Sequence, residues 1–148
     1  MDINLRTPFI LTQFFSDFLH KAKGGGVVIN VSCIRGSRPE AGMIGYCMTK
    51  AGLEMFTKSA AMELAPFGIR VNAVAASVTD TNLYRYAGMT ESEWASMKDR
   101  AASNNPMQRI AKDHEVAKQI IFLTSENAFK ITGHVMKVDG GLSLTTRG

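Results

Sequence analysis

The sequence predicts an α/β fold in which about three parallel strands carry flanking helices. Residues 27–31 form a continuous β-branched apolar run, as in a strand buried on both faces of a parallel sheet. Residues 69–75 give a second strand, and residues 133–138 give a third that ends in a turn. Longer segments with helical spacing separate the three runs. Strands that alternate with helices in this way imply βαβ units and a parallel sheet.

The first helical segment precedes these strands and is rich in phenylalanine from Phe9 to Leu19. Asp2 and Asp17 interrupt the charge pattern that a signal peptide would have, so the segment fits a packed helix. We expect it to lie in the core or in an interface. Three glycines, at 24–26, separate it from the first strand.

Two further helices follow the first strand. The first of them has apolar residues at a helical spacing, namely Leu53, Phe56, Ala60 and Leu64. Pro66 and Gly68 end this helix. Later, the stretch from Thr90 to Glu93 has the pattern of a capping box, which predicts the start of a short helix. Four large side chains lie near that start: Tyr84, Tyr86, Met89 and Trp94. They either line a substrate pocket or pack within the fold, and we favour packing.

The chemistry of the sequence is concentrated in Tyr46 and Lys50. On a helix, positions four apart lie on one face, so the ammonium group can sit near the phenol. A nearby positive charge favours the phenolate and lowers the pKa of tyrosine from its usual value of about 10. We therefore expect an acid–base pair suited to a carbonyl or an alcohol, although the same spacing also occurs by chance on amphipathic helices.

Several motifs occur in order from Asn4 to about Leu144, and together they make the chain resemble the short-chain dehydrogenase/reductase family of the classical type. The motifs are Ile3-Asn4-Leu5, the Asn30-Val31-Ser32-Cys33 strand end, Tyr46-x-x-x-Lys50, residues 68–74, Pro106 to Arg109, Glu115-Val116-Ala117, Phe122-Leu123, Thr132-Gly133 and Val138-Asp139-Gly140-Gly141. The resemblance implies the C-terminal half of a doubly wound, Rossmann-type parallel sheet. It also implies an oxidoreductase that uses NAD or NADP to interconvert a small carbonyl compound and its alcohol.

The resemblance assigns roles to three residues. Tyr46 would give or take the proton at the substrate oxygen, and Lys50 would hold the nicotinamide ribose and lower the pKa of Tyr46. Asn4 would hold a water that links Lys50 to solvent. Asn4 has an equally weighted alternative as a simple helix-start residue, since Asp2 lies two positions earlier.

The chain departs from the family pattern at two places in the expected site. The serine that polarises the substrate lies thirteen positions before the tyrosine, and here that position is Cys33, whose thiol is a weaker donor. Ser32 is adjacent, but consecutive strand residues face opposite ways. Ala76 and Ser77 replace the usual Pro-Gly pair beside the nicotinamide. Thr79 and Thr81 remain as candidates for contacts to the carboxamide and the phosphates of the cofactor. The alternative is that they are loop residues that cap the next segment.

The largest departure concerns the glycine-rich turn that receives the cofactor pyrophosphate in the family. Residues 1–148 do not contain this turn. We therefore expect one truncated domain over residues 1–148, lacking the N-terminal nucleotide-binding half, whereas a complete fold needs about 250 residues. The strand at residues 27–31 would have an open edge. We expect another chain, a second copy or rearranged N-terminal residues to cover that edge, and we expect a homo-oligomer.

Composition excludes several other functions. The net charge of +4 is spread along the chain without a basic run, which argues against nucleic-acid binding. No apolar stretch is long enough to span a membrane, and no Cys/His cluster has metal-binding spacing. Two cysteines without a disulfide framework indicate a reducing intracellular compartment, either cytoplasm or an organelle matrix.

Two classes of function remain open. Tyr46, Lys50 and Asn4 favour an NAD(P)-dependent oxidoreductase. Cys33, the Ala76-Ser77 pair and the missing glycine-rich turn favour the alternative, which is a noncatalytic structural or regulatory subunit derived from that family.

Overall fold

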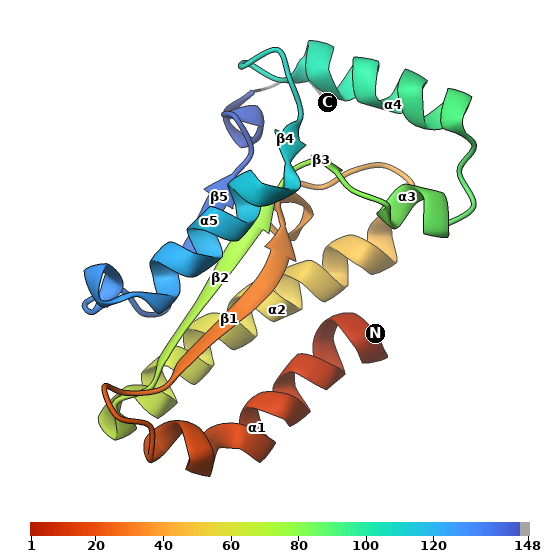
Figure 1. Cartoon of the computed structure of the whole chain (residues 1–148). Coiled ribbons are helices and arrows are strands. Elements are labelled where there is room, and N and C mark those ends of the chain that lie inside the picture. The colour runs from red at the N-terminus through yellow and green to blue at the C-terminus, as the bar shows by residue number, and fades with distance from the viewer. Residues whose placement is uncertain (146–148) are drawn as a thin grey trace.

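The computed structural model describes residues 1–145, and its centre is a parallel sheet of three strands in the order β1-β2-β5 (Figure 1). The strands are β1 (Val27–Cys33), β2 (Arg70–Ala76) and β5 (Val135–Val138). Their number and their parallel pairing confirm the fold class predicted from the sequence. The register pairs Cys33 with Ala76, so the two site positions that depart from the family pattern lie side by side at the carboxyl edge.

The helices and remaining strands are α1 (Thr7–His20), α2 (Ile44–Leu64), α3 (Leu83–Tyr86), α4 (Glu91–Asn104), α5 (Asp113–Thr124), β3 (Thr79–Asp80) and β4 (Ala111–Lys112). Helices flank the sheet, and Figure 1 shows α1 and α2 on one side of it and α5 on the other. A second sheet of two short strands, β3 and β4, lies beyond the carboxyl end of β2 and was not predicted. Short helical turns are η1 (Asp2–Arg6), η2 (Ile34–Gly36), η3 (Ala65–Phe67), η4 (Glu126–Ala128) and η5 (Leu142–Leu144).

The central strand β2 carries most of the core. Val71 and Val74 are completely buried and face opposite sides of the sheet. Val71 packs with Ala60 and Ala61 of α2, whereas Val74 packs with Leu123 of α5. Burial on both faces explains why the strands have apolar runs in place of a clean apolar–polar alternation.

The ends of the elements follow the signals in the sequence. Helix α2 ends at Leu64, and Gly68 adopts a left-handed conformation with φ of 73° after the η3 turn. Helix α4 begins with the predicted capping box, in which the Thr90 side chain accepts from the Glu93 amide and the Glu93 side chain accepts from the Thr90 amide.

Helix α1 contradicts part of the prediction for residues 9–19, because it does not lie in the core of this chain. Thr12 is its only buried residue, and Phe14 and Phe18 are each 68% exposed. Phe9 contacts Phe56 of α2 edge to face, although Phe9 itself is half exposed. The interface role of α1 stays a prediction.

Strand β1 lies at the edge of the sheet, with β2 as its one strand neighbour among residues 1–145. Its Val31 side chain is 55% exposed. The N-terminal residues form η1 and α1 and add no strand to β1 among residues 1–145. What covers this edge stays a prediction.

Candidate active site

The first two turns of α2 carry Tyr46 and Lys50 on one face. The Lys50 ammonium nitrogen lies 5.6 Å from the centroid of the Tyr46 ring, within the range of a weak cation–π contact. Tyr46 is half-buried, and Lys50 is almost completely buried. The predicted pair of residues is therefore brought together by the helix.

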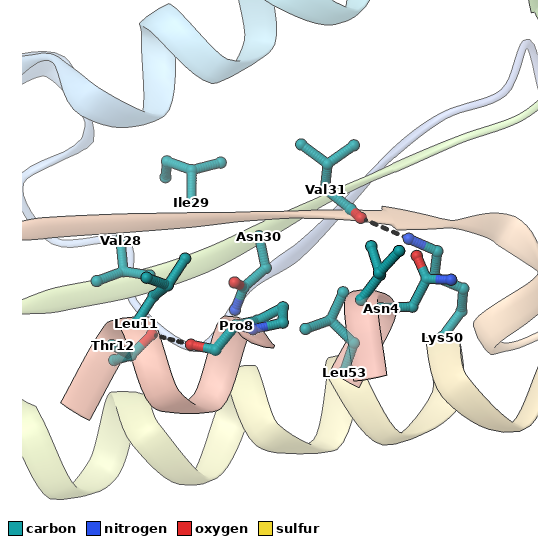
Figure 2. Close-up of a pocket in the computed structure, with 11 residues that line it drawn as sticks. Asn4, Pro8, Leu11, Thr12, Val28, Ile29, Asn30, Val31, Lys50 and Leu53 are labelled. Carbon is teal, nitrogen blue, oxygen red and sulfur yellow. Dashed lines mark hydrogen bonds between the residues drawn. The ribbon is translucent and has the colours of Figure 1, made fainter. Parts of the chain in front are cut away.

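The buried Lys50 side chain has a specific backbone partner. Its ammonium group donates to the Val31 carbonyl at 2.9 Å, as Figure 2 shows. Burial lowers the pKa of Lys50, while the nearby Cys33 has a smaller opposing effect. The lysine is thus fixed under the carboxyl end of β1.

Cys33 is the last residue of β1, and it lies close enough to Tyr46 to raise the pKa of the phenol. The neighbouring Ser32 is turned elsewhere, because its hydroxyl donates to the Glu54 carboxyl group at 3.0 Å. Cys33 and not Ser32 therefore faces the phenol, as the spacing of thirteen residues predicts.

The pKa of Tyr46 is raised, which contradicts the expectation that Lys50 would lower it. Burial of the phenol is the largest cause, and the charge and hydrogen bond of Cys33 come next. Tyr84 and Cys47 add smaller effects in the same direction, and Lys50 is not among the causes. Since Lys50 is directed at the Val31 carbonyl, the environment keeps the Tyr46 hydroxyl protonated.

Asn4 lies inside the turn η1 and lines the same cavity as Lys50. The cavity has a volume of about 330 Å³ and lies between α1, β1 and α2. Figure 2 shows the Asn4 carboxamide beside the Lys50 side chain at one end of it. Asn4 thus lies in the first helical segment of the chain, where no side-chain cap is formed, and both roles expected for it stay predictions.

The loop after β2 holds the remaining predicted residues. The Ser77 amide donates to the Val138 carbonyl at 3.2 Å, and the Thr79 hydroxyl donates to the Ser77 carbonyl at 3.0 Å. Ala76 is the last residue of β2 and pairs with Cys33, and Ser77 and Thr79 follow it along the chain. The Thr81 hydroxyl instead accepts from the Leu83 amide at 3.3 Å, which is the capping role left open by the sequence.

Tyr84 of α3 is a site residue whose place the sequence did not settle. It is close enough to Tyr46 and Cys33 that their charges interact, and its ring stacks on Trp94 at 4.5 Å between centroids. Trp94 is 1% exposed and therefore serves as packing. Tyr86 is 86% exposed, so it does not serve as packing within the described residues.

Sequence reasoning missed Glu54, a buried carboxyl group of α2. It lies four residues after Lys50, so the helical spacing that linked Tyr46 to Lys50 could have found it. Among residues 1–145 no group of three or more His, Cys, Asp and Glu side chains could hold a metal ion. Over the same residues, none of the helices has the length and apolarity needed to cross a membrane.

Comparison with known proteins identifies the family of the chain. A family model described as enoyl-(acyl carrier protein) reductase matches residues 1–143. The chain is 37% identical to the 3-oxoacyl-(acyl-carrier-protein) reductase FabG of Thermotoga maritima, over 96% of this chain and 55% of that protein. The fold and these matches show that the chain belongs to the short-chain dehydrogenase/reductase family, within which it spans about half the length of the curated relatives it matches.

Solved structures give the same result. The ligand-free aldohexose dehydrogenase of Thermoplasma acidophilum superposes with a TM-score of 0.91 at 31% identity, over 99% of this chain and 59% of that one. A short-chain dehydrogenase/reductase of unknown function from Caenorhabditis elegans, solved with cofactor, gives a TM-score of 0.90 at 32% identity, over 97% of this chain and 54% of that one. The solved structures that share this fold are therefore also described as dehydrogenases.

Proposed function

We propose that this chain supplies the proton-transfer groups of an NAD(P)-dependent oxidoreductase that interconverts a small carbonyl compound and its alcohol. The observation that carries the proposal is the corner at the carboxyl end of β1, where the Lys50 ammonium group donates to the Val31 carbonyl and lies 5.6 Å from the Tyr46 ring centroid. Cys33, at the end of the same strand, lies close enough to Tyr46 to raise the pKa of the phenol. The matched relatives named as reductases and dehydrogenases support the same class of reaction.

In this proposal Tyr46 is the acid–base residue. Its raised pKa keeps the hydroxyl protonated at neutral pH, which suits donation to the oxygen of a carbonyl under reduction. Cys33 lies where it can contact the same oxygen, although a thiol is a weaker donor than a hydroxyl. Lys50 and Asn4 line the cavity between α1, β1 and α2. In this proposal, a water held there by Asn4 links Lys50 to solvent.

The residues fit one end of a dinucleotide cofactor, NAD or NADP, which when bound supplies or removes the hydride. Ribose hydroxyls and a carboxamide need hydrogen-bonding partners. Suitable partners here are the hydroxyl groups of Ser77, Thr79 and Thr81 and the ammonium group of Lys50. Tyr46 and Ala76 complete the set that would face the nicotinamide. A relative solved with cofactor supports this assignment. The pyrophosphate would be held by a glycine-rich segment other than residues 1–148.

The open edge of β1 is the proposed place for that other segment. An unpaired edge strand without proline or charged residues, as β1 is, readily pairs with another strand. We propose that the chain works as one truncated domain within a homo-oligomer, or beside a chain that covers this edge. The half-exposed Cys33 and Cys47 thiols suit a reducing intracellular compartment.

The test is a titration of the purified chain with NADH and with NADPH, followed by nicotinamide fluorescence, together with its mass in solution. Saturable binding at micromolar concentration that is weakened by Lys50→Met supports the proposal. The exposed Lys118→Met on α5 is the matched control and should leave binding unchanged. A stable oligomer that binds neither cofactor contradicts it and favours the noncatalytic subunit. With cofactor bound, Tyr46→Phe should abolish carbonyl reduction and leave the binding constant within about threefold.

A further inference from the structure

A buried polar pair joins the end of β1 to α2 next to the proposed site. Glu54 is 8% exposed and Ser32 is 4% exposed, and the Ser32 hydroxyl donates to the Glu54 carboxyl group at 3.0 Å. Burying a carboxyl group costs free energy unless hydrogen bonds compensate it, and apolar side chains of similar size often pack at least as stably. The pair instead fixes the relative orientation of Ser32 and Glu54, because a hydrogen bond has a defined length and angle.

The same pair lies beside the residue that faces Tyr46. Ser32 and Ile34, on either side of Cys33, are both buried, and Ile34 is 1% exposed. Gly36 then brings the turn η2 close to α2, since a Cβ atom there would lie 2.7 Å from Glu54 Cδ and 3.0 Å from the Lys50 carbonyl carbon. The chain around Cys33 is thus held at both sides, and Glu54 contacts both.

We infer that Glu54 is a positioning residue that acts through Ser32 to hold the β1–η2 corner, so that the Cys33 thiol stays against the Tyr46 phenol. The inference rests on the proposed function only for its use: an oriented thiol and phenol at the substrate oxygen. The positioning itself is a property of the fold and can be measured without a cofactor.

The test measures how fast iodoacetamide alkylates Cys33 between pH 7 and pH 9. The background is Cys47→Ser, because the chain has two cysteines and this leaves Cys33 as its single thiol. Ser32→Ala and Glu54→Ala should raise the alkylation rate about fivefold, as expected for an opening equilibrium that loses one hydrogen bond of ordinary strength. Glu54→Gln keeps an oxygen that accepts from Ser32, and should restore the rate to within about twofold of the background.

The matched control is Thr57→Val, one turn further along α2. Thr57 is completely buried and accepts from the Asn30 side chain at 2.9 Å, so it joins the same strand to the same helix without touching the corner. It should lower the melting temperature but leave the alkylation rate unchanged. An equal rise in Thr57→Val, or an unchanged rate in Ser32→Ala, overturns the inference. Should Glu54→Ala fail to fold, Ser32→Ala decides alone. These outcomes do not depend on whether NADH or NADPH binds, so failure here and failure of the proposed function are separate results.

Discussion

Replacing Gly36 with alanine tests the close contact between η2 and α2. The added Cβ would lie 2.7 Å from Glu54 Cδ and 3.0 Å from the Lys50 carbonyl carbon. The Glu54 side chain could rotate away, but it would then lose the hydrogen bond from Ser32. The Lys50 carbonyl belongs to the backbone of α2 and cannot move without distorting the helix.

The expected cost follows from these two contacts. Inserting a methyl group into a filled interior costs about 1–3 kcal/mol, because the surroundings must shift. Losing the hydrogen bond between Ser32 and Glu54 adds about 1 kcal/mol. Gly36→Ala should therefore lower the free energy of unfolding by about 2–4 kcal/mol, and the melting temperature by roughly 5–15 °C for a chain of this size.

The assay is urea unfolding followed by circular dichroism, with Gly45→Ala as the control. Gly45 is a helical glycine of the same α2, and a Cβ there meets nothing within 4 Å. Gly45→Ala should be neutral or stabilising by up to about 1 kcal/mol, because alanine favours helix. In a double-mutant cycle, Glu54→Ala should reduce the cost of Gly36→Ala. A Gly36→Ala variant as stable as the parent chain would show that η2 does not pack on α2 as described.

Three further changes have defined outcomes. Thr90→Ala removes the α4 capping box and should cost about 1 kcal/mol by urea unfolding, with Thr90→Ser recovering most of it. The pKa of Glu115 is lowered from its usual value near 4.5 to about 2 by the hydrogen bond from Arg109, so stability present above pH 4.5 should fall as the pH drops toward 2. Urea unfolding at pH 6 and pH 3 should show a smaller difference in Glu115→Gln, and an equal difference would contradict the pairing. Cys33→Ala should lower the pKa of Tyr46, measured as tyrosinate absorbance relative to Tyr46→Phe, whereas no change would refute their contact.

The sheet could be predicted because its strands are buried on both faces. Val71 and Val74 of β2 must both be apolar, and such runs are visible without any partner. The pair β3 and β4 could not be predicted, since two residues carry no period. The exposure of α1 was also hidden, because the sequence of an apolar helix face is the same whether that face meets a core or an interface.

The candidate site was predictable where helix geometry alone determines it. The spacing of Tyr46 and Lys50 places them on one face whatever surrounds α2. The direction of the pKa of Tyr46 was predicted wrongly, because it depends on burial and on Cys33, and on where the Lys50 ammonium points. The Lys50 ammonium group points at the Val31 carbonyl. That carbonyl belongs to β1, a different element, and only the fold brings it next to the helix.

The electrostatics of the corner bear on the direction of the proposed reaction. Burial raises the pKa of Tyr46 and lowers that of Lys50, so both groups are driven toward their neutral forms. A neutral phenol can give a proton to a carbonyl oxygen but cannot take one from an alcohol. Under the proposed function, the corner as folded therefore holds the protonated phenol, which is the form that reduction uses. Oxidation uses the phenolate, which a positive charge beside the Tyr46 hydroxyl would favour, whereas the Lys50 ammonium group donates to the Val31 carbonyl at 2.9 Å.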